Sequence, residues 1–181
     1  MRRIHMKSLH AGPTHPLGQK QSRLTNMKTR LNYAKEAPGV YESMNSLDSY
    51  LVASGLDNTL LHLVRLRSSQ INGCAYRIDM HWKDLRALGE PEYRLYSLEA
   101  WRESPFYSDK ERAALSWAEA VTLINETRVP EEVYRDVWPQ LSERELCDLT
   151  LAIAAINAWN RLSITARLKP GSHKSPFSEV H

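Results

Sequence analysis

The side chains best suited to chemistry lie in one short segment, residues 67–81. Cys74 and His81 are seven residues apart, a spacing that places both on one face of a helix, two turns from each other. Arg77 lies between them, three residues after Cys74 and four before His81. A cysteine at a helix N-terminus beside a cation meets the conditions for a lowered thiol pKa, because both stabilise the thiolate. The spacing therefore predicts a reactive thiol with a proton-shuttling histidine. A buried structural cysteine with a satisfied helix histidine is the alternative.

The elements that must hold this segment are helices. Asp57 is a candidate N-cap, and Gly73 suits the left-handed residue that would separate that helix from the one beginning near Cys74. Ser108 and Ser142 are each followed three residues later by glutamate, which is the pattern of a capping box. No stretch shows the period-two alternation of a strand. The sequence predicts an all-α fold of about seven helices, at residues 38–54, 57–72, 74–88, 90–102, 108–126, a short piece after Pro130 and about 143–168.

Composition and charge exclude several classes of protein. The 181 residues are 42% apolar and 25% charged, which is enough for the core of one domain. Residues 1–26 supply five basic side chains and no acidic one, whereas the rest of the chain holds 19 basic and 21 acidic residues. That body has no electrostatic footprint for nucleic acid, and no apolar run reaches the length that spans a membrane. Two cysteines without a secretory signal predict a reducing, cytoplasmic setting.

The chain is expected to divide into three parts. Residues 1–26 form a disordered leader or an overlong start, since prolines and glycines interrupt any amphipathic helix there. Residues 27–170 form the helical domain, and residues 171–181 form a flexible polar tail. We expect no cofactor and no preorganised metal site, and in particular none at the leader histidines His5, His10 and His15.

Four stretches of the sequence carry a family resemblance. The first is Ser69-Gln-Ile-Asn-Gly-Cys-Ala-Tyr76, followed by His81. The others are residues 95–104, 108–120 and 153–161. Together they resemble the AhpD-like alkylhydroperoxidase and carboxymuconolactone decarboxylase superfamily, and fit its peroxidase-like branch. The similarity covers about residues 27–170.

The resemblance implies an all-helical fold that assembles into homo-oligomers. In the peroxidase-like branch a Cys-x-x-Cys pair at a helix start reduces hydroperoxides: the second cysteine attacks the peroxide and the first resolves it to a disulfide. A histidine four residues later and an upstream acidic residue help to move protons. On this sequence Cys74 matches the first cysteine and His81 the histidine, whereas Arg77 occupies the second cysteine's position and His62 the acidic one.

The departure at Arg77 leaves three functions open. Cys74 can act as a one-cysteine peroxidase whose thiolate is stabilised by Arg77 and whose sulfenate is reduced by an external thiol. The chain can instead be a non-catalytic family member with a structural or binding role. It can also be a decarboxylase-type lyase in which Arg77 and His81 hold an anionic carboxylate. Cys147 is a further candidate resolving thiol, although its surroundings indicate the core face of the last long helix.

Several polar and aromatic residues are candidates for modifying the site or lining a substrate pocket. Gln70 directly precedes the Cys74 helix and can orient His81 or a substrate oxygen, or cap the helix before it. Buried amides in the last helix must be hydrogen-bonded, either to a ligand or in a clasp between helices or subunits. Aromatic side chains near Cys74 can enclose an apolar substrate or belong to the core. The pocket candidates are Tyr76, Trp101, Asn157 and Asn160, with Trp82 and Arg161 beside them.

Overall fold

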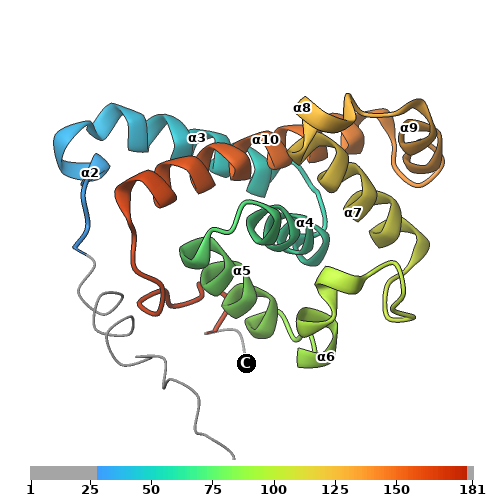
Figure 1. The fold of residues 1–181 in the computed structure, drawn as a ribbon, viewed down its shortest axis with the longest axis horizontal. Coiled ribbons are helices and arrows are strands. Elements are labelled where there is room, and N and C mark those ends of the chain that lie inside the picture. The colour runs from blue at the N-terminus through green and yellow to red at the C-terminus, as the bar shows by residue number, and fades with distance from the viewer. Residues whose placement is uncertain (1–27, 179–181) are drawn as a thin grey trace, which may run out of the picture.

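The structure, a computed structural model, describes residues 28–178, so the predicted leader lies outside the described part of the chain. Within that range the chain is helical and contains no strand (Figure 1). The expectation of an all-α fold is confirmed. The elements are α2 (Tyr33–Glu36), α3 (Pro38–Ala53), α4 (Asn58–Ile71), α5 (Ala75–Ala87), α6 (Glu92–Tyr96), the 3-10 helix η1 (Leu98–Ala100), α7 (Asp109–Thr122), α8 (Ile124–Thr127), α9 (Glu131–Val137) and α10 (Glu143–Ala166).

The number of helices differs from the expected seven, because residues 28–178 contain nine α-helices and η1. The added helices α2 and α8 have four residues each, about one turn. An apolar stripe needs more than one turn to show its period, so such helices leave no signal in the sequence. The helix expected at residues 90–102 is divided into α6 and η1.

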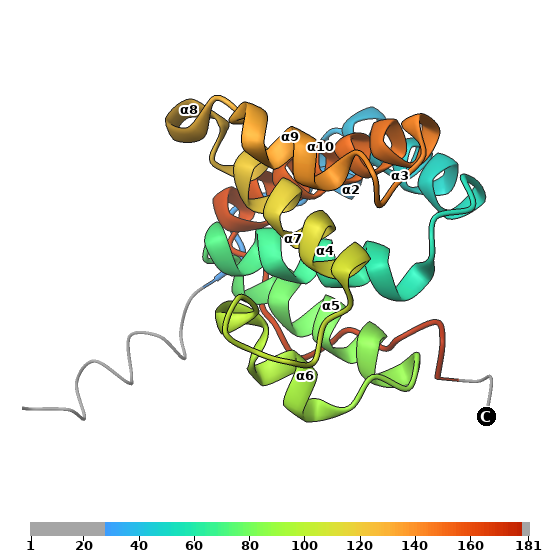
Figure 2. The same ribbon diagram turned by 90° about the vertical axis from the view of Figure 1, so that its right-hand side faces the viewer.

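Helix α4 lies at the centre of the molecule, between a layer that contains α3 and α10 and a layer that contains α5 and α6 (Figures 1 and 2). Nine of its fourteen residues are buried, so it contributes to the core on almost every side. Leu60 and Val64 pack against α7, α9 and α10, whereas Leu63 and Leu66 pack towards α5, α6 and η1. Burial of each such leucine stabilises the fold by about 1.5–3 kcal/mol. This central position makes α4 a rigid support for the segment that follows it.

The turn from α4 to α5 places Cys74. Gly73 has φ +65°, a left-handed conformation that glycine adopts without strain, and it ends α4 as predicted. The backbone N–H of Cys74 donates to the carbonyl of Ser69 at 3.0 Å, and Cys74 becomes the N-cap of α5. The start of α4 is itself capped, since Asp57 accepts a hydrogen bond from the N–H of Leu60 at 2.8 Å.

Both capping boxes that the sequence predicts are formed. In α7 the Ser108 and Glu111 side chains bond to each other's backbone N–H groups, and in α10 Ser142 and Glu145 do the same. Helix α10 has 24 residues, so it is about 36 Å long. Along this length it contacts α3, α4, α5 and α7. Within residues 28–178, no helix combines the length and the apolar character needed to cross a membrane.

The segment after α10 returns along α5. The Gly171 N–H donates to Asp79 and its carbonyl accepts from Lys83, both of which lie on α5. Further along, His173 contacts Asp84 and Phe177 packs edge-on against the ring of His62, with centroids 5.4 Å apart. Residues 171–178, expected to be part of a flexible tail, therefore make polar contacts and one aromatic contact with α4 and α5. Contacts of this kind leave no apolar periodicity in the sequence from which they could be predicted.

Candidate functional site

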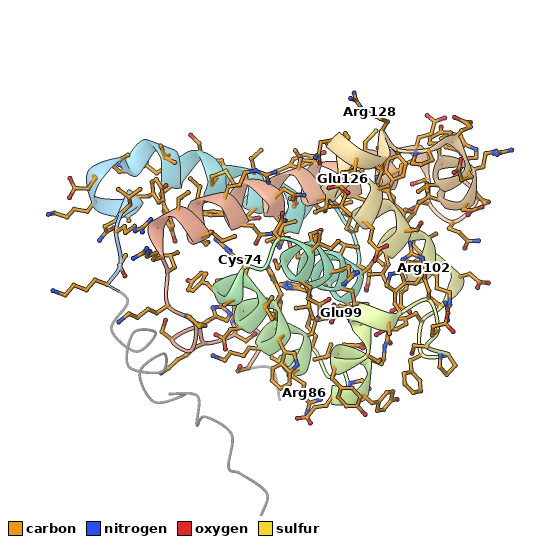
Figure 3. The ribbon with its side chains drawn as sticks, viewed as in Figure 1. Cys74, Arg86, Glu99, Arg102, Glu126 and Arg128 are labelled. Atoms are coloured by element: carbon orange, nitrogen blue, oxygen red, sulfur yellow. The ribbon has the colours of Figure 1, made fainter. Side chains whose placement is uncertain are left out.

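The thiol of Cys74 is buried at the N-terminus of α5, with 1% of the residue exposed (Figure 3). The backbone N–H groups of Tyr76 and Arg77, the hydroxyl of Ser163 and the Arg77 charge lie near the sulfur and favour its thiolate form. These four groups lower the thiol pKa, but burial has the larger effect and raises it above its ordinary value. The expectation of a lowered Cys74 pKa is therefore wrong, because desolvation outweighs the helix terminus and the cation.

The side chain of Arg77 is buried between α5 and α10. Its guanidinium lies over the ring of Trp159 at 4.3 Å, and its Nε and Nη1 donate to Ser163 Oγ at 3.4 Å and Met80 Sδ at 3.2 Å. Among the described residues no carboxylate lies within ion-pair distance of it; the nearby Asp48 is paired with another arginine. Arg77 is thus a buried cation with donor capacity to spare, which is costly unless a ligand or solvent in a cavity satisfies it.

Asp48 on α3 fixes the position of Trp159, whose ring contacts the Arg77 guanidinium. Its Oδ1 accepts from Arg65 Nη2 at 2.8 Å, and its Oδ2 accepts from Trp159 Nε1 at 2.8 Å. Arg65 comes from α4 and Trp159 from α10, so one carboxylate connects three helices. Because the Trp159 ring carries the Arg77 guanidinium, this network also positions Arg77.

A cavity of about 410 Å³ opens on one side of Arg77. Its volume suits a small organic molecule. The cavity is lined by side chains from the segment between residues 29 and 34, from α3, α5 and α10, and by Leu168. Arg77 also lines a second cavity of about 90 Å³, and the two cavities share four lining residues. The shared residues are Asp48, Arg77, Met80 and Trp159.

His81 is buried in a cluster with His62 and Asp84. The Nδ1 atoms of the two histidines are 3.2 Å apart, and Asp84 Oδ2 lies 3.5 Å from His62 Nδ1 and 3.8 Å from His81 Nδ1. Burial, with the nearby arginines, lowers the pKa of His62 to about 4 and that of His81 well below its ordinary value, so both rings are neutral near pH 7. The structure thus brings His62 and His81 into contact, whereas His81 and Cys74 share no hydrogen bond within the described residues.

Asn157 and Asn160 connect α10 to its neighbours. Asn157 accepts from Asn72 Nδ2 at 2.8 Å and donates to Thr122 Oγ1 at 3.1 Å, while Asn160 accepts from Ser69 Oγ at 3.1 Å. These are contacts to α4, its C-cap and α7, and neither amide lines the 410 Å³ cavity. Both therefore form a polar clasp between helices.

The remaining pocket and site candidates are Tyr76, Gln70 and Trp101, and they differ in whether they line the 410 Å³ cavity. Tyr76 lines it beside Arg77, whose guanidinium lies 5.6 Å from the tyrosine ring. Gln70 is at the end of α4, where it accepts from Arg67 at 3.4 Å. Trp101 belongs to the core cluster around α5 and α6, and its Nε1 donates to Glu119 at 2.9 Å. Of these three residues, only Tyr76 faces the cavity.

Cys147 is exposed on the first turns of α10, not on its core face as its surroundings indicated. It lies sixteen residues before Ser163, the α10 residue beside Cys74, and that separation corresponds to about 24 Å along the helix. Two cysteines can be bridged only when their Cα atoms are within about 7 Å. An intramolecular disulfide between Cys74 and Cys147 is therefore excluded without a large rearrangement.

Several residues of the site have no role in the sequence-based hypothesis. Asp84 is three residues after His81 on α5, a spacing that was available as a signal. Asp48, Trp159, Ser163 and His173 come from distant segments, and nothing in the sequence pairs them with Cys74 or His81. Their contribution follows from how α3, α10 and the C-terminal segment pack around α5.

Comparison with known proteins identifies the family. A sequence model of the carboxymuconolactone decarboxylase family matches residues 38–120, from α3 to α7. The crystal structure of ATU0492, a protein of unknown function from Agrobacterium tumefaciens, is 41% identical, with a TM-score of 0.78 over 81% of this chain and 100% of that one. The chain belongs to the carboxymuconolactone decarboxylase family.

Other relatives of this family member extend the match. The uncharacterized protein YdfG of Bacillus subtilis (strain 168) is 44% identical over 138 residues, which cover 76% of this chain and 94% of YdfG. An uncharacterized peroxidase-related protein from Ralstonia eutropha JMP134, with an alkylhydroperoxidase AhpD core, has a TM-score of 0.68 at 17% identity, over 80% of this chain and 76% of that one. The last shows the fold alone. The resemblance to the AhpD-like superfamily is thereby confirmed.

Proposed function

We propose that this family member is a hydroperoxide reductase that works with the single thiol of Cys74. The observation that carries the proposal is the group of donors around the sulfur: two backbone N–H groups, the Ser163 hydroxyl and the Arg77 cation offset part of the cost of forming a buried thiolate, although burial still raises the thiol pKa. Tyr76, Arg77 and Ser163 also line the 410 Å³ cavity, so a small hydroperoxide bound there would contact residues that neighbour the thiol, although Cys74 itself does not line the cavity. The family resemblance assigns His81 to proton transfer at this site and leaves His62 and Gln70 as candidates for modifying it.

The chemistry divides into oxidation and reduction of one sulfur atom. The Cys74 thiolate attacks the terminal oxygen of R–O–OH, the O–O bond breaks, and the leaving alkoxide takes a proton as ROH. Cys74 becomes a sulfenic acid. An external thiol then forms a mixed disulfide and releases water, and a second thiol molecule releases Cys74 as thiol and leaves as the external disulfide. Arg77 stabilises the thiolate before the attack and the developing negative charge during it.

The test follows Cys74 directly. Limiting hydroperoxide is added to the full chain in the presence of dimedone, and intact mass is recorded for the wild type and for Cys74→Ser. A dimedone adduct on the wild type alone supports the proposal, with Cys147 as the internal control because its thiol is exposed and lies far from Arg77. An unmodified Cys74 under conditions where a generic thiol reacts would sink it.

Turnover separates an active site from an impaired one. Hydroperoxide consumption is measured with a small-thiol reductant for the wild type, Cys74→Ser and Arg77→Cys. Loss of consumption only in Cys74→Ser supports one-cysteine catalysis. Consumption that appears only in Arg77→Cys, where a second thiol stands three residues from Cys74, instead indicates a non-catalytic family member whose fold has been kept for binding.

The unpaired charge of Arg77 favours a second candidate, a lyase or binding protein for a small carboxylate. A buried guanidinium with no carboxylate partner in the described chain, facing a cavity of this size, suits a bidentate carboxylate ligand. Binding of small carboxylates is measured by calorimetry for the wild type and Arg77→Met. Tight binding that is lost in Arg77→Met but kept in Cys74→Ser favours this candidate over the peroxidase.

We also propose that the protein is a homo-oligomer. The support is an open, mainly apolar groove of about 550 Å³ between α3 and α10, lined by Val40, Met44, Ala158 and Leu162 among others. A contiguous exposed apolar surface often marks a site of protein–protein interaction. Light scattering coupled to gel filtration gives the subunit number, and Met44→Glu is expected to shift it towards the monomer. A monomeric wild type at micromolar concentration would contradict the proposal.

A further inference from the structure

A buried group of three potential ligand atoms lies apart from the thiol, in the wall of the 90 Å³ cavity. These are Nδ1 of His62, Nδ1 of His81 and Oδ2 of Asp84, all within 4.8 Å of one another. We infer that they bind one divalent transition-metal ion, with Zn²⁺ as the probe ion. Two imidazoles and one carboxylate form a donor set that Zn²⁺ and other first-row divalent ions accept.

The distances among the three atoms fit a single ion. They are 3.2, 3.5 and 3.8 Å, and a triangle with these sides has a circumradius of about 2.0 Å. One point is therefore equally far from all three atoms, at the length of a Zn–N or Zn–O bond, which is about 2.0–2.2 Å. The three interatomic distances therefore fit one ion as they stand. A fourth ligand on the cavity side would draw the ion out of their plane by a small displacement.

The ligands are held by rigid elements. His62 lies on the central helix α4, while His81 and Asp84 are three residues apart on α5, and each of the three is at most 7% exposed. The second oxygen of Asp84 accepts a hydrogen bond from His173 Nε2 at 2.7 Å, which fixes the carboxylate's orientation. Such outer contacts orient metal ligands in known sites. Phe177 packs against the ring of His62 and closes the site from the C-terminal segment.

Without an ion the cluster is poorly satisfied. The distances from Asp84 Oδ2 to the two Nδ1 atoms, 3.5 and 3.8 Å, are too long for good hydrogen bonds. The two Nδ1 atoms can share only one proton between them. The three atoms therefore make at most one good hydrogen bond among themselves, whereas one cation can be bound by all three.

The charges around the cavity determine what completes the coordination. Arg65 and Arg77 both line the 90 Å³ cavity. Asp48, which also lines it, is paired with Arg65. Two guanidinium groups disfavour a bare dication and favour one that carries an anionic fourth ligand, such as hydroxide or a carboxylate. The inference does not depend on the peroxidase proposal, because Cys74 is not among the ligands.

The test measures tight Zn²⁺ binding to the full chain after removal of metal by a chelator and dialysis. We expect one tight equivalent in the wild type, in competition with a chromogenic chelator. His81→Gln and Asp84→Asn should each lose that equivalent, with affinity falling more than about 100-fold, and His173→Gln should lose about 10- to 100-fold. Asp79→Asn is the matched control, since Asp79 is on the same helix but bonds Lys83 and Gly171, and its tight equivalent should remain.

The histidines of residues 1–26 are present in every variant, so weak binding by them is common to the whole series. If the wild type has no tight equivalent, or if His81→Gln and Asp84→Asn keep it, the inference is overturned. Co²⁺ provides a readout that needs no variant. Loading the wild type with Co²⁺ should produce the intense visible absorption of a four- or five-coordinate ion, which Zn²⁺ then abolishes, and a spectrum no different from that of hydrated Co²⁺ would also overturn it.

Discussion

Asp48 is expected to be essential for stability, because it satisfies two buried donors from different helices. Its carboxylate accepts from Arg65 and Trp159, each at 2.8 Å, and Arg65 is only 6% exposed. The change Asp48→Asn keeps the shape of the side chain but removes its charge and replaces one acceptor with an amide donor. That donor then faces either the guanidinium or the indole N–H.

The size of the effect follows from the burial of the pair. A hydrogen bond to a charged group contributes about 1.5–3 kcal/mol, and breaking a fully buried ion pair costs about 3–5 kcal/mol. The Asp48 side chain is 31% exposed, so solvent screens part of the interaction. We expect Asp48→Asn to lower the free energy of unfolding by about 2–3 kcal/mol. At about 2–4 °C per kcal/mol for a chain of this size, the melting temperature should fall by roughly 4–12 °C.

The assay is urea unfolding at neutral pH, followed by tryptophan fluorescence. Glu36→Gln is the control, because the Lys35–Glu36 pair is largely exposed and its loss should change the free energy of unfolding by less than about 0.5 kcal/mol. A double variant with Arg65→Met removes both charges, so its loss should be smaller than the sum of the two single losses by at least about 1 kcal/mol. A loss below about 0.5 kcal/mol for Asp48→Asn, or strict additivity in the double variant, would refute this reasoning.

Four further outcomes are expected. Because burial raises the Cys74 pKa, the rate of Cys74 alkylation should increase only as pH rises past the ordinary thiol range. Arg77→Met removes a stabilising cation and should shift this increase to still higher pH. A rate midpoint below the ordinary thiol pKa in the wild type would contradict the raised pKa. Ser142→Ala, which opens the capping box of α10, should cost about 1 kcal/mol in urea unfolding, and an unchanged midpoint speaks against the cap. The Glu145 pKa is lowered to about 2 by Lys110 and Ser142, so its contribution is present above the ordinary glutamate pKa and is lost as pH falls towards about 2; Glu145→Gln should reduce the slope of stability against pH in that window. Asn157→Leu breaks the clasp to Asn72 and should destabilise by about 1–3 kcal/mol without changing the Cys74 reaction rate, which stopped-flow kinetics can verify.

Local signals in the sequence predicted the elements that carry Cys74. Gly73 ends α4 because its left-handed backbone conformation favours glycine, and two serine–glutamate pairs start α7 and α10 because they satisfy backbone donors nearby in the chain. These interactions involve residues at most a few positions apart, so the sequence pattern contains them completely. The one-turn helices α2 and α8 were missed because their length gives no period to detect.

The chemistry of the site was less accessible. Spacing placed Arg77 and His81 on one face, but it contained no information on the depth of burial, and burial reverses the expected shift of the Cys74 pKa. The contacts of His62 with His81 and Asp84 depended on how α4 and α5 pack. Cys147 was expected on a core face, yet the rotation of α10 leaves it exposed.

By itself the sequence determined the all-helical fold, the family and the segment that holds the reactive residues, since capping, helix periodicity and a contiguous motif are properties of neighbouring residues. Only the tertiary structure decided that Arg77 rests on Trp159 and lines two cavities, and that His62, His81 and Asp84 converge on one point. The physical reason is that solvation and electrostatic fields depend on every helix packed around a group. The sequence places Cys74 at a helix terminus, among groups that favour the thiolate. The helices packed around it bury the thiol, and that burial raises its pKa.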